Sequence, residues 1–296
     1  MLVIGSRGSQ LALWQARWVQ ERLSARGFES RVEIIKTTGD KITDIPLGSF
    51  GGKGLFTKEI EEALLAGEVD LAVHSLKDLP TEMPKGLEIV AIPKREDPRD
   101  AIVGRKLAEL REGAKVGTSS LRRSTQLQQL RPDLQIESVR GNVDTRLRKL
   151  DEGQYDAIVL AAAGLTRLGL GARIAELLTP EVMCPAVGQG ALAIECRADA
   201  GPASTACRPL DHADTRAAVI AERSLLSALG GGCSTPIGAY AHVSTQRLTL
   251  VAVVLSPDGG QSVRETAEGS AADAERIGRE LGARLLSRGA AQILHG

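Results

Sequence analysis

Aromatic side chains are scarce in this chain of 296 residues, because Phe, Trp and Tyr together make up 2% of it. Proteins that bind single-stranded nucleic acid stack bases on such rings, so the composition argues against that class. An excess of charge of one sign is also missing, since 37 Lys and Arg residues balance 37 Asp and Glu residues. Zero net charge disfavours a general polyanion binder and leaves room only for local basic clefts.

Long apolar segments are absent as well. No run reaches the ~18 apolar residues of a transmembrane helix, and the segment Met1–Arg7 lacks the features of a signal peptide. The cysteines Cys184, Cys196, Cys207 and Cys233 have no C-x-x-C spacing, so we expect reduced thiols in a cytoplasmic protein. The 4 histidines are isolated and match no zinc-ligand spacing, which predicts no metal site.

What the chain does have is a repeated pattern of strand, turn and helix. Val3–Leu11 and Lys115–Arg123 both read as a strand, a turn with Gly and Ser or Thr, and a helix. Tyr155–Ala161 likewise echoes Val69–Ser75. We therefore predict an α/β fold with two similar lobes and a ligand cleft between them.

The predicted domains follow from where this pattern breaks. Charged or Pro- and Gly-containing stretches at Arg95–Asp100 and Cys184–Gly190 are candidate crossings that would form a hinge. After residue 210 the pattern changes to a helix, three strands and a helical end. The predicted boundaries are 1–95 with 190–210 for the first lobe, 96–189 for the second lobe, and 211–296 for a small C-terminal α+β domain.

The stretch Thr37–Phe56 contains five glycines and predicts a long loop. Loops of this length in compact domains are usually lids or binding loops. A helix is expected to follow at Lys58–Ala66, with Thr57 as its cap and Gly67 as its end.

A polar cluster closes the apolar run that begins at Val69. It contains His74, Ser75, Lys77 and Asp78, and ligands in α/β folds bind at the carboxyl ends of strands. Asp78 is therefore a candidate for proton transfer. An acid role at neutral pH would require burial, because the reference pKa of Asp is about 3.9, and a surface turn is the alternative.

The segment from residue 115 to residue 150 is locally basic and richer in Arg than in Lys. Guanidinium groups bind carboxylates and phosphates bidentately, so this composition favours recognition of a planar anion. Arg122 and Arg123 lie at a predicted strand-to-helix turn, where a helix N-terminus adds positive potential, and Arg140 follows the next predicted strand. For several other cations of the segment, a solvated helix face is the better interpretation.

Other motifs are weaker. Lys53 is followed by Gly54 rather than by Ser or Thr, so the glycine-rich stretch is no P-loop. Gly188–Ala193 leads into a predicted strand rather than a helix, which excludes a dinucleotide fingerprint. Cys233 follows three glycines; it is either an exposed thiol or a small buried side chain, and no activating neighbour stands near it in the sequence.

Several segments, in order over nearly the whole chain, carry a resemblance to one family. They are Ile4–Ala16, Gly51–Phe56, Val73–Pro80, Arg95–Asp100, Gly117–Arg123, Arg140–Val143, Gly164–Gly169, Gly188–Gly190 and Gly231–Gly238. Together they resemble porphobilinogen deaminase (hydroxymethylbilane synthase). The resemblance implies two lobes like those of periplasmic binding proteins and a small domain that carries a cysteine.

The resemblance also implies an activity. Members of this family join four porphobilinogen molecules head to tail with release of ammonia, and then hydrolyse the product to hydroxymethylbilane in haem biosynthesis. By similarity, Cys233 holds a dipyrromethane cofactor through a thioether and Asp78 is the catalytic carboxylate. The implied partners are porphobilinogen and the growing oligopyrrole, with no nucleic acid and no membrane. The family expectation is a monomer.

The remaining site residues are carried over by position. Cations for the acetate and propionate groups of the rings would be Arg7, Arg122, Arg123, Arg140, Arg146 and Arg167. Their hydrogen-bonding neighbours would be Ser9, Ser75, Lys77, Thr118, Ser120 and Gln189. Lys53 and Phe56 lie on the glycine-rich loop, the expected lid.

Two other classes of function stay open on the residues alone. A two-lobed sensor of a small anion would need the clefts and arginines but neither Asp78 nor Cys233. A nucleic-acid binder would use the basic segment, and zero net charge and scarce aromatics disfavour it.

Overall fold

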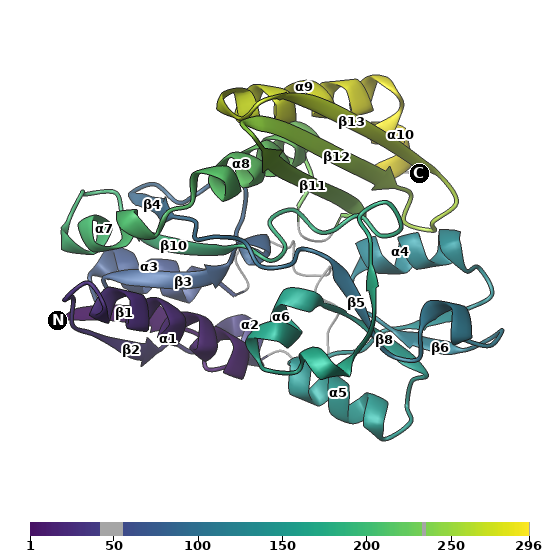
Figure 1. Ribbon diagram of the computed structural model, residues 1–296, viewed down its shortest axis with the longest axis horizontal. Helices are drawn as coiled ribbons and strands as arrows, with labels where there is room; N and C mark the ends of the chain where they lie inside the picture. The colour runs from purple at the N-terminus through teal and green to yellow at the C-terminus, as the bar shows by residue number, and fades with distance from the viewer. Residues whose placement is uncertain (42–55, 233–234, 296) are drawn as a thin grey trace. The chain divides into compact units, whose positions relative to one another are not determined.

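The computed structural model describes residues 1–41, 56–232 and 235–295. The chain divides into two compact units, of which one comprises Met1–Glu96 with Ala191–Arg216 and the other Asp97–Gly190 with Ala217–Gly296. The first unit contains one five-stranded sheet, and the second contains a five-stranded and a three-stranded sheet (Figure 1). No described helix is both long and apolar enough to cross a membrane.

The first unit is assembled from two separated stretches of chain. Its strands are β1 (Leu2–Ser6), β2 (Ser30–Ile34), β3 (Leu71–Ser75), β4 (Leu87–Ala91) and β10 (Leu192–Arg197). Its helices are α1 (Gln10–Ser24), α2 (Thr38–Lys41), α3 (Lys58–Ala66) and α7 (Pro202–Cys207), with 3₁₀ turns η2 (Leu76–Asp78) and η5 (Arg208–Leu210).

The strand order of this sheet is β2-β1-β3-β10-β4. β1 pairs in parallel with β2 and β3, whereas β10 runs antiparallel between β3 and β4. Both faces are covered, because Val19 and Leu23 of α1 join a buried cluster with Leu71 and Val73, while Ile60 of α3 belongs to a cluster on Ala72. Successive residues of β3 therefore face opposite helices, as alternation along a strand requires.

The second unit repeats this arrangement. Its first sheet has β5 (Asp100–Gly104), β6 (Lys115–Gly117), β7 (Gln135–Glu137), β8 (Ala157–Ala161) and β9 (Ile174–Leu178). The connecting elements are η3 (Leu107–Glu109), α4 (Leu121–Leu130), α5 (Val143–Asp151), α6 (Ala162–Arg167) and η4 (Gly171–Arg173).

The order β7-β6-β8-β5-β9 matches the order of the first sheet strand for strand, with β5 in the antiparallel position that β10 holds there. The predicted α/β class and the two similar lobes are therefore confirmed. The predicted domain boundaries, including the separation of a C-terminal domain within the second unit, stay predictions.

The remaining elements of the chain follow α8 (Ala213–Ala228). They are β11 (Ile237–Ser244), β12 (Arg247–Leu255), β13 (Ser262–Ser270), η6 (Ala271–Asp273), α9 (Ala274–Ser287) and α10 (Ala290–His295). The three strands form an antiparallel meander. Leu225 of α8 and Leu281 and Leu285 of α9 are buried with Leu250 of β12 in one hydrophobic cluster, so helices cover one face of this sheet (Figure 1).

Local expectations from the sequence are largely confirmed. α3 spans the predicted Lys58–Ala66, and Gly67 ends it with a positive φ of 75°. The capping role expected of Thr57 is wrong: Thr57 is the residue before the helix, but its φ of −122° and ψ of −29° are not extended and its side chain makes no capping bond. The predicted loop Thr37–Phe56 begins with α2, and its residues 42–55 lie outside the described part.

Gly278 sets the distance between α9 and α8. A Cβ at this position would stand 2.2 Å from the carbonyl oxygen of Ala221 and 2.9 Å from Cβ of Ser224. We predict that Gly278→Ala lowers the free energy of unfolding by about 1–3 kcal/mol, the usual cost of overpacking. Denaturant unfolding would measure it, with Gly171→Ala as the control because a Cβ there meets nothing within 4 Å. Equal stability of the two variants would contradict this account of the helix crossing.

Candidate active site

A polar pocket lies in the first unit, where β1 and β3 both end. Its lining residues come from the turn after β1, from α1 and α3, and from the end of β3. They are Arg7, Ser9, Leu11, Ala12, Gln15, Phe56, Thr57, Ile60, Val73, His74, Ser75 and Asp78. Five of the predicted site residues, Arg7, Ser9, Phe56, Ser75 and Asp78, thus meet at one place, as expected for strand ends in an α/β sheet.

Asp78 is the last residue of η2, directly after β3. Leu76 and Leu79 on either side of it are buried, and the Leu76 amide donates to the Ala191 carbonyl at 3.0 Å. These contacts fix the backbone while the carboxylate itself is exposed at the pocket. The burial that an acid at neutral pH would need is therefore not found, so the geometry suits a carboxylate that accepts hydrogen bonds and offsets positive charge.

The other pocket residues are held by contacts of their own. Ser9 caps α1, since its Oγ accepts a hydrogen bond from the Ala12 amide at 3.3 Å. Gln15 donates through Nε2 to Oγ of Ser75 at 2.8 Å. The guanidinium of Arg7 stands 4.1 Å above the centre of the Phe56 ring, a cation–π contact that keeps its charge at the pocket.

A buried acid–base pair lies behind this pocket. Nε2 of His74 is 3.0 Å from Oε2 of Glu195, and neither side chain is more than about one-twentieth exposed. Glu61 of α3 is close enough to interact electrostatically with both side chains. Burial raises the pKa of the Glu61 carboxyl, the charge of Glu195 adds to that rise, and His74 opposes it.

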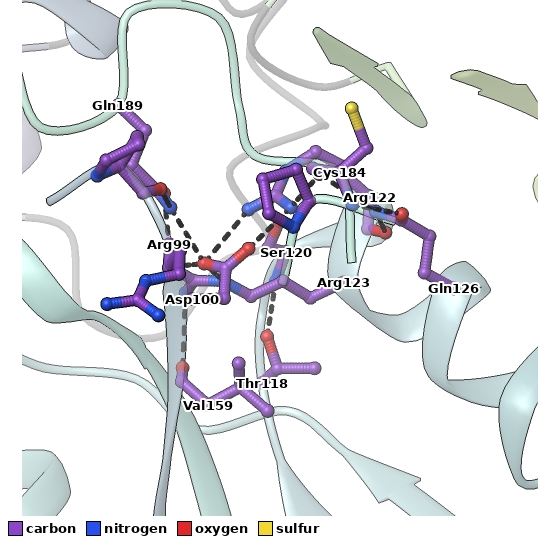
Figure 2. A network of polar contacts seen from close by, with 12 residues as sticks. Arg99, Asp100, Thr118, Ser120, Arg122, Arg123, Gln126, Val159, Cys184 and Gln189 are labelled. Atoms are coloured by element: carbon purple, nitrogen blue, oxygen red, sulfur yellow. Dashed lines mark hydrogen bonds and ion pairs between the residues drawn. The ribbon is translucent and has the colours of Figure 1, made fainter. Parts of the chain in front are cut away.

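A second cluster, the Asp100 cluster, forms in the second unit around the first residue of β5 (Figure 2). Arg122 contacts both carboxylate oxygens of Asp100 through Nη1 at 2.7 Å and Nη2 at 3.3 Å. Arg123 donates to Oδ1 through Nε at 2.8 Å. All three side chains are buried, with Asp100 fully so.

Backbone and amide groups complete the Asp100 cluster. Arg122 also donates to the Cys184 carbonyl at 2.6 Å, and Arg123 to the Val159 carbonyl at 3.1 Å. Nε2 of Gln189 donates to the Pro98 carbonyl at 2.7 Å and to Asp100 at 3.0 Å. The two arginines that the sequence predicted to bind a ligand anion thus face a carboxylate of the protein itself.

Two guanidinium groups against one carboxylate leave the cluster with one positive charge in excess. Nε of Arg122 is buried and has no hydrogen-bond partner in the described part of the chain. Burial alone would raise the pKa of Asp100, but the charges of Arg122 and Arg123 outweigh it and hold that pKa well below its usual range. Asp100 is therefore ionised at every physiological pH.

The other predicted cations of the second unit are placed as follows. Arg140 is half-buried after β7, and Arg146 of α5 donates through Nε to the Gly141 carbonyl at 2.7 Å. Arg167 is buried and donates to the Gly190 carbonyl at 2.7 Å. Thr118 and Ser120 precede α4, and Oγ1 of Thr118 accepts from the Ser120 amide at 3.2 Å (Figure 2). Lys77, in the first unit, is half-buried in η2.

Two predicted site residues, Lys53 and Cys233, lie outside the described residues. The other three cysteines are free thiols and buried, and burial raises the pKa of Cys184 to about 12. Within the described ranges no group of three His, Cys, Asp or Glu side chains is arranged to hold a metal ion.

Sequence reasoning missed Asp100 and the pair of His74 with Glu195. Asp100 stands in a charged, Pro-containing stretch that reads as a surface crossing. A signal was present nonetheless, since an apolar run begins directly after it and two adjacent arginines need a counter-charge when buried. Glu195 interrupts an apolar strand, which is the pattern of a buried carboxylate with a partner.

The fold and these residues define a class: an α/β protein with two lobes of one topology, whose polar pocket and buried arginines suit an anionic ligand. Two family profiles match the chain, "Porphobilinogen deaminase, dipyromethane cofactor binding domain" over residues 2–204 and "Porphobilinogen deaminase, C-terminal domain" over residues 216–287.

Curated relatives agree with these matches. The chain is 55% identical to porphobilinogen deaminase of Trichlorobacter lovleyi, over 99% of this chain and 95% of the relative, and 54% identical to that of Syntrophobacter fumaroxidans, over 98% and 96%. The chain belongs to the porphobilinogen deaminase family. A periplasmic substrate-binding protein from Coxiella burnetii is similar in structure at 16% identity, over 71% of this chain and 91% of that one, with a TM-score of 0.45.

The residues present fit the cofactor that this family carries. Dipyrromethane bears carboxylate side chains and pyrrole N–H groups, so its site must supply cations and an acceptor. In the first-unit pocket Arg7 supplies a cation, and Asp78 presents an exposed carboxylate as an acceptor. Both requirements are thus met among the described residues.

We predict that Asp100→Asn strongly destabilises the protein, by about 3–5 kcal/mol near neutral pH, because it leaves two buried guanidinium groups without a counter-ion. Since the folded-state pKa of Asp100 is depressed, its contribution is present above the unfolded pKa of ~3.9 and is lost only as the pH falls through the folded value. Thermal unfolding of wild type and variant between pH 4 and pH 8 would measure the difference.

Asp133→Asn is the matched control for this prediction. Asp133 forms a similar double contact with one guanidinium, that of Arg131, but at the surface. Surface ion pairs contribute little to stability, so the control should unfold near the wild-type temperature. If Asp100→Asn also unfolds near that temperature, the Asp100 cluster does not carry the stability assigned to it.

Proposed function

We propose that the chain works as a porphobilinogen deaminase through the residues of the first-unit pocket and the arginines of the second unit. The reaction condenses four porphobilinogen molecules stepwise onto a dipyrromethane primer, releases one ammonia at each step, and ends in hydrolysis to hydroxymethylbilane. The observation that carries this proposal is the convergence of Asp78, Arg7, Ser9, Ser75 and Phe56 on one pocket.

Asp78 is proposed as the catalytic carboxylate. Loss of ammonia from an aminomethylpyrrole leaves a cationic azafulvene, which the free α-carbon of another ring attacks. An exposed carboxylate on a fixed backbone can accept pyrrole N–H bonds and offset the developing cation. Leu76 and Leu79 supply the fixed backbone, because both are buried beside it.

The arginines and their neighbours are proposed to bind acetate and propionate groups. Arg7 is held at the pocket by Phe56, and in the second unit Arg140 and Arg146 are half-buried. Arg122, Arg123 and Arg167 are buried and bonded within the protein. Their contribution to binding these carboxylates is therefore the excess positive charge of the Asp100 cluster and any N–H donors not used within the protein. The hydrogen-bonding neighbours proposed are Ser9, Ser75, Lys77, Thr118, Ser120 and Gln189, and the proposed lid residues are Lys53 and Phe56.

Cys233 is proposed as the attachment point of the cofactor through a thioether. The three other cysteines are buried, which disfavours them as attachment points. The cofactor supplies a pyrrole α-carbon on which the chain is started. We further propose a cytoplasmic monomer with no nucleic-acid or membrane partner, which mass photometry and cell fractionation would test.

The attachment predicts the intact mass of the denatured protein. Wild type should exceed its polypeptide mass by two linked pyrrole units, Cys233→Ala should have the bare mass, and Cys207→Ala should keep the excess. A bare wild-type mass that does not change on incubation with porphobilinogen would favour a two-lobed binding protein without covalent chemistry.

The catalytic role predicts a second result. Asp78→Asn should lower kcat for ammonia release by about 10²–10⁴-fold, the range for loss of a group that handles protons and charge, while retaining bound pyrrole. Glu82→Gln is the control, since Glu82 is an exposed carboxylate just beyond Pro80 that does not line the pocket. Equal loss in both variants, or none in Asp78→Asn, would remove Asp78 from the catalytic role and favour an anion sensor.

A further inference from the structure

Three buried oxygen atoms of the first unit have no hydrogen-bond partner among the described residues. They are Oγ1 of Thr57, Oε1 of Glu61 and Oε1 of Glu195. The exposed fractions of these residues are 1%, 9% and 0%, so bulk solvent does not supply the missing bonds. Buried polar atoms in proteins are almost always paired, and three unpaired atoms in one region therefore indicate a bound hydrogen-bonding molecule.

Strand pairing directs Glu195 towards α3. Glu195 lies opposite Ala72 in the antiparallel pair of β10 and β3, so both side chains are on the same face of the sheet. Ala72 shares a hydrophobic cluster with Ile60 and Leu64 of α3, which shows that α3 covers this face. The side chain of Glu195 therefore points to the side of α3 that packs on the sheet.

Thr57 and Glu61 lie on the same side of α3. The Glu61 amide donates to the Thr57 carbonyl at 2.8 Å, the contact of residues one helical turn apart, and residues with this spacing share a helix face. Burial raises the pKa of the Glu61 carboxyl, the Thr57 side chain lowers it, and Glu195 raises it further, so both residues are close to this carboxyl. The three unpaired atoms thus come together from α3 and β10.

The side chains present do not pair these atoms with one another. The Thr57 hydroxyl has a single hydrogen, which cannot satisfy two carboxyl oxygens. Nε2 of His74 lies 3.0 Å from Glu195, but its contact is with Oε2 rather than with Oε1. A direct hydrogen bond between the carboxyl groups of Glu61 and Glu195 would be an alternative, and their Oε1 atoms make none.

A single water molecule matches the hydrogen-bonding capacity of the three atoms. It can donate one hydrogen to each carboxyl oxygen, and its own oxygen can accept the hydrogen of the Thr57 hydroxyl. Buried waters make about three hydrogen bonds, typically to polar groups that otherwise lack partners. An ammonium ion fits less well, because it accepts no hydrogen bond and would leave the hydroxyl hydrogen unpaired.

We propose that Thr57, Glu61 and Glu195 form the binding site of one internal water molecule that joins α3 to β10. The water connects the start of α3, next to Phe56 at the pocket wall, to a strand from the second stretch of the first unit. This site lies beyond the proposed function, since no step of the reaction passes through it.

A crystal structure of the full wild-type chain, at a resolution that shows ordered water, tests the site. We expect one peak of water density about 2.5–3.0 Å from each of the three oxygen atoms. A direct hydrogen bond between Glu61 and Glu195, or a side chain from elsewhere in the chain at this place, would overturn the proposal. An anomalous peak after a thallium soak would also overturn it, because thallium replaces potassium and ammonium ions but not water.

Magnetic relaxation of water ¹⁷O measures how long internal waters reside in the protein in solution. Thr57→Val keeps the shape of the side chain and removes one partner of the water. We expect the residence time to shorten about two- to tenfold, the effect of one hydrogen bond. Thr57→Ser, which restores a hydroxyl, should return the residence time towards the wild-type value.

Ser30→Ala is the matched control. Oγ of Ser30 is also buried and without a partner among the described residues, but Ser30 is on β2, which two strands separate from β10. This variant should keep the wild-type residence time. Equal residence times in wild type and Thr57→Val, or equal shortening in Ser30→Ala, would contradict the proposed site.

The wild-type crystal structure decides the proposal even if a variant fails to fold. Neither measurement depends on turnover. If wild type does not consume porphobilinogen, the proposed function fails while the water site is unaffected, and a missing water peak would overturn the site without bearing on the activity.

Discussion

A fully buried carboxylate is the constraint on which the second unit depends. Asp100 is fully buried, and it persists as an ion because two guanidinium groups and an amide surround it. Its partners come from α4 and from the segment after Met183, while Asp100 itself begins β5 (Figure 2). One charge thus fixes the start of a central strand, the first turn of a helix and a returning segment of the chain. Displacing any one of these three segments would leave an unpaired charge in a low-dielectric interior.

The same principle recurs with other acids. Glu222 is fully buried and accepts hydrogen bonds from the amides of Gly188 at 2.7 Å and Ala241 at 2.8 Å. The segment from Cys184 to Gly190 is therefore held near its C-terminal end by two buried carboxylates, Asp100 through Gln189 and Glu222 through Gly188. In the first unit the fully buried Glu195 contacts the imidazole of His74, and its other carboxylate oxygen has no hydrogen-bond partner among the described residues.

The fold was predictable because its signals are local and repeated. Apolar runs of strand length, the turns after them and Gly67 at a helix end depend on nearest neighbours, and the structure places them as expected. The pocket was predictable in part, since Asp78, Ser75 and Arg7 follow strands whose carboxyl ends meet in such a sheet. The pattern of Arg122 and Arg123 correctly indicated that they bind a planar anion. The sequence could not show whether that anion is a ligand carboxylate or Asp100, because Asp100 lies over twenty positions away in a stretch that resembles a surface segment. His74 with Glu195 was hidden for the same reason, because only strand pairing brings them together.

The position of β10 has a consequence for the order in which the protein acquires its structure during synthesis. In the first sheet β10 (Leu192–Arg197) lies between β3 and β4, whereas the whole second sheet lies between Asp100 and Leu178. Domains usually fold in order from the N-terminus as the chain emerges from the ribosome. In this chain the first sheet stays incomplete, without the strand that pairs with both β3 and β4, until the second lobe has left the ribosome. The nascent first lobe therefore presents two unpaired strand edges for the time that about a hundred residues take to be translated, and it is the stage at which this chain most needs protection from aggregation.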